Sequence, residues 1–337
     1  TVKQRLVIRP CYCDRITKAI DAYIRKADND LSKQLGKEGY AKPKKTLQYA
    51  QDIEDDVADI LTEETDYFVR EAKAAGSLDE FEKKLPAVTA ATPATAKLSK
   101  AFAARLSKFL PEYAAYYLKQ TDKSLKLDRV SKRTTAWIEN WSGELAGLMR
   151  TTSKDQLEAM LKKEISNGGN ISQFCVDLIN SSMEKEGKGE YWTSHYRARR
   201  VAVTEILGAH SVAQQEAFMQ SPAVESKGWM HTGNYRNEPR QNHIDMDGQI
   251  VAKDQPFELI GADGIVYHPM YPRDVILPAG ERINCHCIQQ PIVSEDILGL
   301  PLEERKKLQQ QAIDDMDDEW EAELDAQNKA KAGIEDE

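Results

Sequence analysis

The stretch YWTSHYRARRVAVTEILGAHSVAQQEAFMQSP, residues 191–222, stands where the character of the sequence changes. Its apolar residues recur at helical spacing, and the pattern ends at Ser221 and Pro222, because proline cannot continue a helix. Arg197, Val201 and Glu205 follow one another at intervals of four residues, which places them on one face. The stretch is therefore predicted to be a long helix.

The sequence before this helix is helical in pattern almost throughout. Helices are predicted over residues 14–31, 46–76, 98–121, 135–150, 152–168 and 170–183. Pro111 is expected to bend or break its helix, and Thr152 or Ser153 is expected to cap the helix that follows. Residues 83–100 are rich in Pro, Ala and Thr and are predicted to be a linker. Cys175 fits the apolar face of its short helix and is predicted to lie in a core.

After Pro222 the sequence changes to short β-prone runs separated by Gly, Pro, Asn and Asp. These runs fall in residues 226–234, 248–259, 263–272 and 282–293. The predicted fold class is α+β: a long helical N-terminal region, a small β-rich C-terminal domain, and a C-terminal acidic helix or tail. The expected divisions are residues 1–189, 190–292 and 293–337.

The formal net charge of −9 is unevenly distributed. Residues 311–337 hold a net −9, whereas residues 1–50 and 97–133 each hold a net +7. Two basic segments and an acidic end suit contact with polyanions or acidic partners, although solvated helix faces are the simpler explanation. The chain has no apolar run of the roughly 20 residues that a membrane span needs. Five cysteines, an odd number, argue against a secreted disulfide framework and favour a reducing cytoplasm during synthesis.

The β-rich region and the helix before it contain an ordered series of motifs. The series consists of Arg200, Thr204-Glu205, Trp229, Arg240-x-x-His243, Asp247-Gly248, Pro256-Phe257, Tyr271-Pro272 and Asn284-Cys285-His286-Cys287. This order resembles the phage Mu F-like minor head proteins, the phage head morphogenesis family, over about residues 190–292. His286 is a departure, because the family usually has Arg between the two cysteines.

The resemblance implies a minor capsid protein of a tailed bacteriophage, located in the virion and in the host cytoplasm during assembly. Such a protein is expected to associate with the portal, the major capsid protein or the scaffolding protein. It is expected to aid procapsid assembly, DNA packaging or ejection, and not to be an enzyme. DNA contact is expected through residues 1–50 and 97–133, and no membrane contact is expected.

Cys285 and Cys287 raise the question of a metal. Thiolate and imidazole are good ligands for zinc, and in a strand these two cysteines would face one side while His286 faces the other. A structural zinc would then need His243, with His231 or His268 as a further ligand. Simple packing of both cysteines on the closing strand and a disulfide or redox role are the alternatives.

Arg240 and His243 also allow two interpretations. They could bind a phosphate or carboxylate, or they could fix the Trp229 strand and the Asp247-Gly248 turn through buried hydrogen bonds. The sequence also allows two other functional classes. One is a metal-dependent nuclease or toxin-like enzyme using His243, Cys285 and Cys287, and the other is a plain DNA-binding protein.

Overall fold

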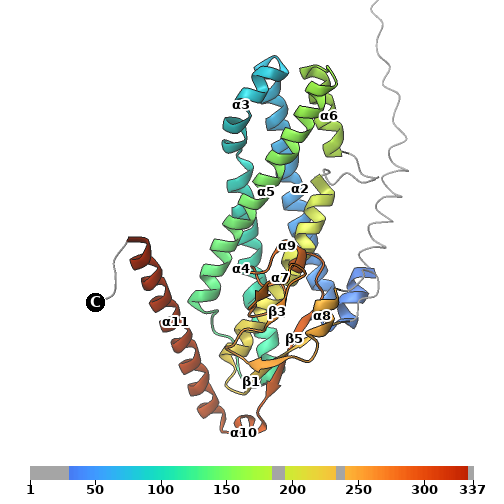
Figure 1. The fold of residues 1–337 in the computed structure, drawn as a ribbon. Helices are drawn as coiled ribbons and strands as arrows, with labels where there is room; N and C mark the ends of the chain where they lie inside the picture. Colours follow the sequence, from blue (N-terminus) through green and yellow to red (C-terminus); the bar gives the residue numbers. More distant parts are fainter. Residues whose placement is uncertain (1–29, 184–193, 233–239, 333–337) are drawn as a thin grey trace, which may run out of the picture.

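The computed structural model describes residues 30–183, 194–232 and 240–332. The predicted helix over residues 14–31 lies outside them except for its last two residues. The described N-terminal helices are α2 (Pro43–Ala75), α3 (Leu78–Ala90), α4 (Ala94–Thr121), α5 (Lys132–Ser166), α6 (Ile171–Met183) and α7 (Ser194–Gln220). Helices α2, α4, α5 and α7 form a long bundle, with α3 and α6 at the end remote from the strands (Figure 1).

The C-terminal region is built from short elements. They are β1 (Val224–Met230), α8 (Gln241–Asp245), β2 (Ile250–Ala252), β3 (Leu259–Ile260), β4 (Val266–Tyr267), α9 (Ala279–Arg282) and β5 (Ile288–Val293), followed by α10 (Glu295–Leu298) and α11 (Leu302–Ala332). One antiparallel sheet has the order β2-β1-β5, and β3 pairs with β4 in a separate hairpin. The predicted α+β class, with its long helical N-terminal region, is confirmed.

The predicted linker over residues 83–100 is wrong. Most of it is helical, and only residues 91–93 connect α3 to α4. Pro86 lies inside α3 and removes one backbone hydrogen bond, a cost of about 3 kcal/mol. Phe81, Leu85 and Val88 are buried from the same helix, and each stabilises by about 1.5–3 kcal/mol. Burial therefore outweighs the local cost of the proline.

Neither of two predicted helix breaks occurs, and a bend at Pro111 stays a prediction. Helix α4 continues through Pro111, where buried Phe109, Leu110 and Tyr113 hold it against the bundle. Helix α5 is continuous over the stretch where Thr152 or Ser153 was expected to begin a new helix. The Thr152 hydroxyl instead donates to the Leu148 carbonyl one turn earlier, at 3.1 Å. Side-chain hydroxyls can make such bonds in mid-helix, so a capping residue type does not by itself mark a helix start.

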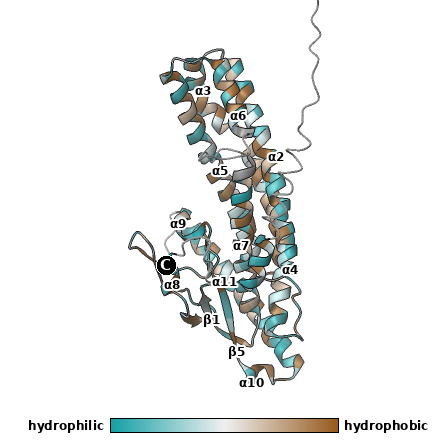
Figure 2. Ribbon diagram, turned by 90° about the vertical axis from the view of Figure 1, so that its right-hand side faces the viewer, coloured by the Kyte–Doolittle hydropathy of each residue, from teal (hydrophilic) through white to brown (hydrophobic). Residues whose placement is uncertain are grey.

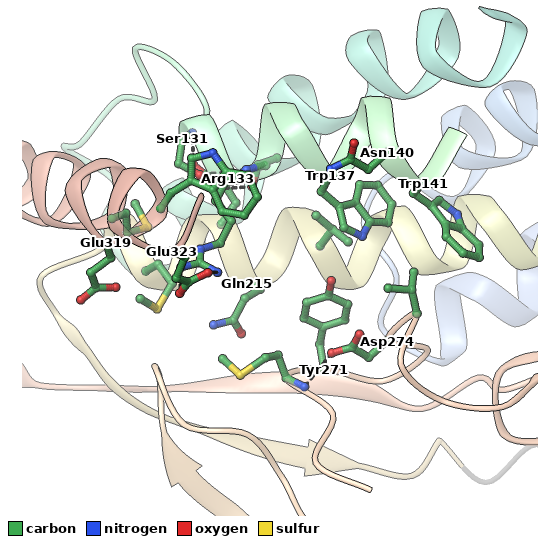
Figure 3. Close-up of a pocket in the computed structure, with 18 of the residues that line it drawn as sticks. Ser131, Arg133, Trp137, Asn140, Trp141, Gln215, Tyr271, Asp274, Glu319 and Glu323 are labelled. Carbon is green, nitrogen blue, oxygen red and sulfur yellow. Dashed lines mark hydrogen bonds and ion pairs between the residues drawn. The ribbon is translucent and has the colours of Figure 1, made fainter. Parts of the chain in front are cut away.

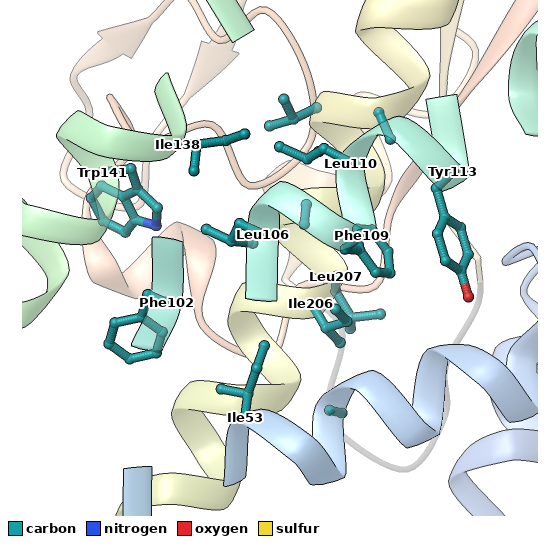
Figure 4. Packing of buried hydrophobic residues seen from close by; sticks show 14 of the residues in the cluster. Ile53, Phe102, Leu106, Phe109, Leu110, Tyr113, Ile138, Trp141, Ile206 and Leu207 are labelled. Carbon is teal, nitrogen blue, oxygen red and sulfur yellow. The ribbon is translucent and has the colours of Figure 1, made fainter. Parts of the chain in front are cut away.

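The helical region has two apolar cores separated by a buried polar layer. The proximal core joins α2, α4, α5 and α7 around residues such as Phe109 and Trp141 (Figure 4). The distal core joins α2, α3, α5 and α6 and includes Cys175, as predicted. Figure 2 shows hydrophobic and hydrophilic residues alternating along these helices, as expected when each buries one face.

The polar layer consists of Glu64 on α2, Thr92 before α4, and Ser153 on α5. The Ser153 hydroxyl donates to Glu64 at 2.8 Å and the Thr92 hydroxyl donates to it at 3.1 Å. Burial raises the pKa of Glu64, and these two hydrogen bonds act in the opposite direction. The layer crosses the bundle between Leu61 of the proximal core and Phe68 of the distal core.

Helix α11 lies against α5 and α7 and places acidic side chains beside basic ones (Figure 1). Asp317 accepts hydrogen bonds from the Lys132 N–H at 2.8 Å and from Arg129 at 2.7 Å. Arg133 binds both carboxylate oxygens of Glu323, at 2.6 and 3.0 Å. Among the helices of the described residues, none is long and apolar enough to cross a membrane.

A pocket of about 530 Å³ remains between α11, α5, α7 and the loop at residues 270–275 (Figure 3). Trp137 and Trp141 line it from α5, Gln215 lines it from α7, and Tyr271 lines it from the loop. Arg133 and Glu323 pair at its edge. Helix α11 is thus fixed to α5 by ion pairs and leaves an apolar space beside them.

Replacing Asp317 by Asn should destabilise the protein by about 1–3 kcal/mol at neutral pH, because the buried carboxylate holds two charge-assisted or backbone hydrogen bonds. Although burial acts in the opposite direction, the Lys132 N–H and Arg129 lower the pKa of Asp317. The contribution of the Asp317 carboxylate to the free energy of unfolding is therefore fully present above the pKa of about 3.9 that Asp has in the unfolded chain. It is lost as the pH falls through the lower pKa of Asp317 in the folded protein. Urea titrations at several pH values would show the difference shrinking in acid. The exposed neighbour Asp318→Asn is the control, with an effect within about 0.5 kcal/mol.

Candidate metal centre

The backbone before β5 brings the two cysteines together. Asn284 has a φ of 59°, a left-handed conformation that Asn tolerates better than most residues, and the Cys285 N–H donates to the Arg282 carbonyl at 3.2 Å. Residues 285–287 belong to no strand, and β5 begins only at Ile288. The predicted closing strand is therefore shorter than expected, although the cysteines still point to one side.

His243, Cys285 and Cys287 form a buried cluster. The His243 Nδ1 atom lies 3.6 Å from Cys285 Sγ and 3.7 Å from Cys287 Sγ. The candidate ligand atoms of all three residues lie within 4.8 Å of one another. All three side chains are 2–3% exposed, and both cysteines are free thiols. The cluster thus offers two sulfurs and one imidazole nitrogen to a common point.

Glu281 holds His243 from behind. The His243 Nε2 atom is 2.8 Å from a Glu281 carboxylate oxygen, so the proton is assigned to Nε2 and the lone pair to Nδ1, which faces the sulfurs. The Ala262 N–H and the Asn242 amide also donate to Glu281. Burial opposes a charge on His243, but the hydrogen bonds with Cys285 and Glu281 raise its pKa.

The other three histidines of this region have different positions. His231 Nδ1 lies 3.7 Å from Cys287 Sγ, so it joins the edge of the cluster. His268 is exposed and lies outside the cluster, which removes it as the alternative ligand. His286 points away and bonds Glu38 at 2.8 Å, in the helical region. The expected alternation of residues 285–287 is observed.

Arg273 was missed by the sequence analysis and is central to the site. It is 2% exposed and donates to the carbonyls of Cys285 and Cys287 at 2.9 and 2.8 Å and to the Ser211 hydroxyl on α7 at 2.7 Å. A hydrogen bond from Cys287, the nearby His243 and the Arg273 charge together lower the pKa of the Cys285 thiol. Arg273 directly follows the Tyr271-Pro272 motif, which was the available signal.

Arg240 and His243 meet at Glu281. Arg240 donates to the Ile283 carbonyl at 2.6 Å, and its Nε is 3.9 Å from Glu281. These contacts tie α8 to the turn before the cysteines and support the structural interpretation of the pair. The carboxylate that the pair could bind is thus Glu281 of the same chain.

Five further motif residues build the core and the turn around the cluster. Trp229 packs on Phe257 at 5.3 Å between ring centroids and on His243 at 6.1 Å. Gly248 has a φ of 83°, as the Asp-Gly turn predicts, and Asp247 accepts the His231 N–H at 2.8 Å. Pro256 precedes Phe257, whose N–H donates to the Pro269 carbonyl.

The motif residues on α7 lie elsewhere. Arg200, Thr204 and Glu205 line a pocket of about 420 Å³ together with Arg282. Glu205 accepts a hydrogen bond from the Trp141 indole at 2.6 Å and lies 3.6 Å from Arg282, which stacks over Trp141 at 4.3 Å. Arg282 begins the turn that ends at Cys285. The contacts among Glu205, Trp141 and Arg282 therefore connect α5 and α7 to the segment that carries the two cysteines, but these three residues are not part of the cluster.

Comparisons with known proteins show which family has a sequence of this kind. The chain matches the model of the phage Mu protein F like protein family over residues 140–290. It is 31% identical over 316 residues to the uncharacterized protein YqbB of Bacillus subtilis (strain 168), covering 90% of this chain and 99% of that relative. No solved structure matches the chain.

The chain therefore belongs to the phage Mu F-like protein family. The resemblance stated from the motifs is confirmed, and the matched range covers the α7 motif, the Arg240-x-x-His243 element and both cysteines. Membership assigns the chain to the phage head morphogenesis proteins and associates it with the virion.

Replacing Arg273 by Met should destabilise the protein by about 2–5 kcal/mol, because two buried carbonyls and the Ser211 hydroxyl each lose a donor. Urea denaturation followed by circular dichroism measures this. Arg150→Met removes an exposed guanidinium from α5 and should change the free energy of unfolding by less than about 0.5 kcal/mol. Equal effects of the two variants would refute the role given to Arg273.

Proposed function

We propose that the protein is a minor head protein that binds the portal protein during procapsid assembly and thereby aids DNA packaging or ejection. The observation that supports this most strongly is the match to a head morphogenesis family, together with a relative aligned over 99% of its length. The major capsid protein and the scaffolding protein are the other partners that the resemblance implies. Portal association is proposed first because minor head proteins of this family are expected at that vertex.

An exposed apolar surface on the β3–β4 hairpin supports a protein partner. Ile260 and Val266 are opposite each other in the hairpin and are 58% and 46% exposed. Ile265, between them in the chain, is 54% exposed, and Ile244 on the neighbouring α8 is 37% exposed. Clustered apolar side chains in water are unfavourable and typically mark a binding surface. We assign this hairpin face to the portal contact.

DNA contact is a weaker part of the proposal. In the segment 97–133, five of the ten basic residues are already paired with acids of the same chain: Lys97, Arg105, Arg129, Lys132 and Arg133. The remaining lysines are exposed and could contact phosphates in a salt-sensitive, sequence-independent manner. Most of the other basic segment, residues 1–50, precedes the described residues.

We infer that the Cys/His cluster has no catalytic role. Its three side chains are 2–3% exposed, and His243 is already engaged by Glu281, so a phosphodiester has no access to it. A nuclease assay on plasmid DNA with added zinc or magnesium tests this inference. Cleavage that disappears in His243→Ala, while a folded exposed-histidine variant His268→Ala retains it, would establish an enzyme instead.

Ile260→Lys combined with Val266→Lys should weaken portal binding by about tenfold or more, since central apolar anchors typically contribute over 1 kcal/mol each. Co-expression with the portal protein and affinity purification measure the binding. Leu148→Lys is the matched control, because Leu148 is 56% exposed and belongs to α5, not to the hairpin. If wild-type protein never co-purifies with the portal and is absent from purified heads, the proposed function is wrong.

A further inference from the structure

We propose that His243, Cys285 and Cys287 bind a zinc ion and that His231 supplies its fourth ligand. The inference does not depend on the portal contact. It goes beyond membership of the family, because it concerns how the small domain is held together. It rests on the geometry of the cluster, the group behind His243 and the size of the domain.

The sulfur–nitrogen distances fit a tetrahedral site. Zinc bonds sulfur at about 2.3 Å and imidazole nitrogen at about 2.0–2.1 Å, so a tetrahedron has sulfur–nitrogen edges of about 3.6 Å. The three such distances in the cluster are 3.6 Å and 3.7 Å from His243 to the two sulfurs and 3.7 Å from His231 to Cys287. Thiol–imidazole hydrogen bonds have similar lengths, so the convergence of all three ligand atoms within 4.8 Å of one another carries the assignment.

The surroundings of His243 match those of a metal ligand. A ligating histidine almost always donates its second ring nitrogen to a carboxylate or carbonyl, which fixes the tautomer. Glu281 is that carboxylate, itself 3% exposed and held by two further donors. In addition, the Trp229 Nε1 atom is buried in the same apolar cluster as both cysteines and lies beside Cys287. A thiolate near this N–H would give it an acceptor.

A cross-link would also stabilise the small domain. Its strands are two to seven residues long, and its own buried apolar cluster has seven members, two of which are the cysteines. Domains of this size often depend on a metal or a disulfide, since one small core stabilises them too little. A zinc ion at the cluster would join the end of β1, helix α8 and the segment before β5.

His231 is placed to close the site. It follows β1 directly, and its backbone N–H is fixed by Asp247. Its ring contacts Cys287 but lies outside the tight group of three, so metal binding is expected to draw it toward His243. Four protein ligands in a buried site define a structural zinc, whereas a water in the fourth position would define an open, catalytic type of site.

The test is metal analysis of the full-length chain, purified under reducing conditions without chelator and then incubated with zinc and desalted. We expect one zinc per chain, and X-ray absorption should show two sulfur and two nitrogen ligands. Cys285→Ser and Cys287→Ser should each lower the zinc content several-fold. Cys175→Ser, which alters a buried thiol in the distal core, should leave the content unchanged.

His231→Ala should weaken zinc binding by at least about tenfold in competition with a chromophoric chelator, while His268→Ala should not. Because cysteine variants can misfold, cobalt substitution of the wild-type chain provides an independent readout, with intense visible bands expected for tetrahedral thiolate coordination. A folded wild-type chain that binds no zinc or cobalt overturns the proposal. A Cys285–Cys287 disulfide in the reduced preparation also overturns it, and a bound water in place of His231 overturns the assignment of the fourth ligand.

Discussion

Helix α7 is enclosed on nearly every side, and its polar residues must therefore find partners inside the protein. Residues 205–218 are buried without a break. His210 is hydrogen-bonded to Tyr117 at 2.8 Å and to Thr46 at 3.0 Å, and burial lowers its pKa, so it is neutral. Glu216 accepts bonds from Ser131 and Thr134. Each unpaired group would cost about 1–3 kcal/mol, which makes the positions of α2, α4 and α5 mutually dependent.

The same helix positions the small domain through polar contacts. The Gln289 amide on β5 donates to the Ser211 carbonyl at 2.9 Å, and the buried ammonium of Lys227 on β1 donates to Gln215 at 3.0 Å. Burial lowers the pKa of Lys227 to about 7. Arg273 adds its bond to the Ser211 hydroxyl and holds both cysteine carbonyls. The Cys/His cluster is therefore positioned from the bundle and not only by its own sheet.

The sequence was sufficient to predict the fold class, because helical periodicity and short β-prone runs are local signals. It also predicted that His243, Cys285 and Cys287 lie together. It failed where tertiary contacts override local preference: Pro86 and Pro111 are tolerated inside packed helices, and Ser153 binds Glu64 instead of capping. Glu281 and Arg273 were missed because the sequence does not show which ring or backbone carbonyls they face, even though Arg273 directly follows the Tyr271-Pro272 motif. His268 was considered as a ligand because the sequence does not show that its side chain is exposed and lies outside the cluster.

The charge distribution shows a similar limit. The acidic C-terminal part and the basic segment 97–133 were separate features in the sequence, yet α11 pairs with Arg129, Lys132 and Arg133. The excess of each sign is thereby partly neutralised within one molecule. The net charge counted along the chain is therefore larger than the charge that this surface presents to a DNA phosphate or to another protein.

The polar layer of Glu64, Thr92 and Ser153 has a consequence for how this architecture can vary. Because the layer closes off the proximal core, the distal helices pack around a core of their own and share few side chains with the Cys/His domain. Whole helical turns could be added or removed beyond the layer, in matched pairs, without shifting the register of α7 against the sheet. The length of the bundle is thus set at one end, while the Cys/His cluster and its contacts lie at the other.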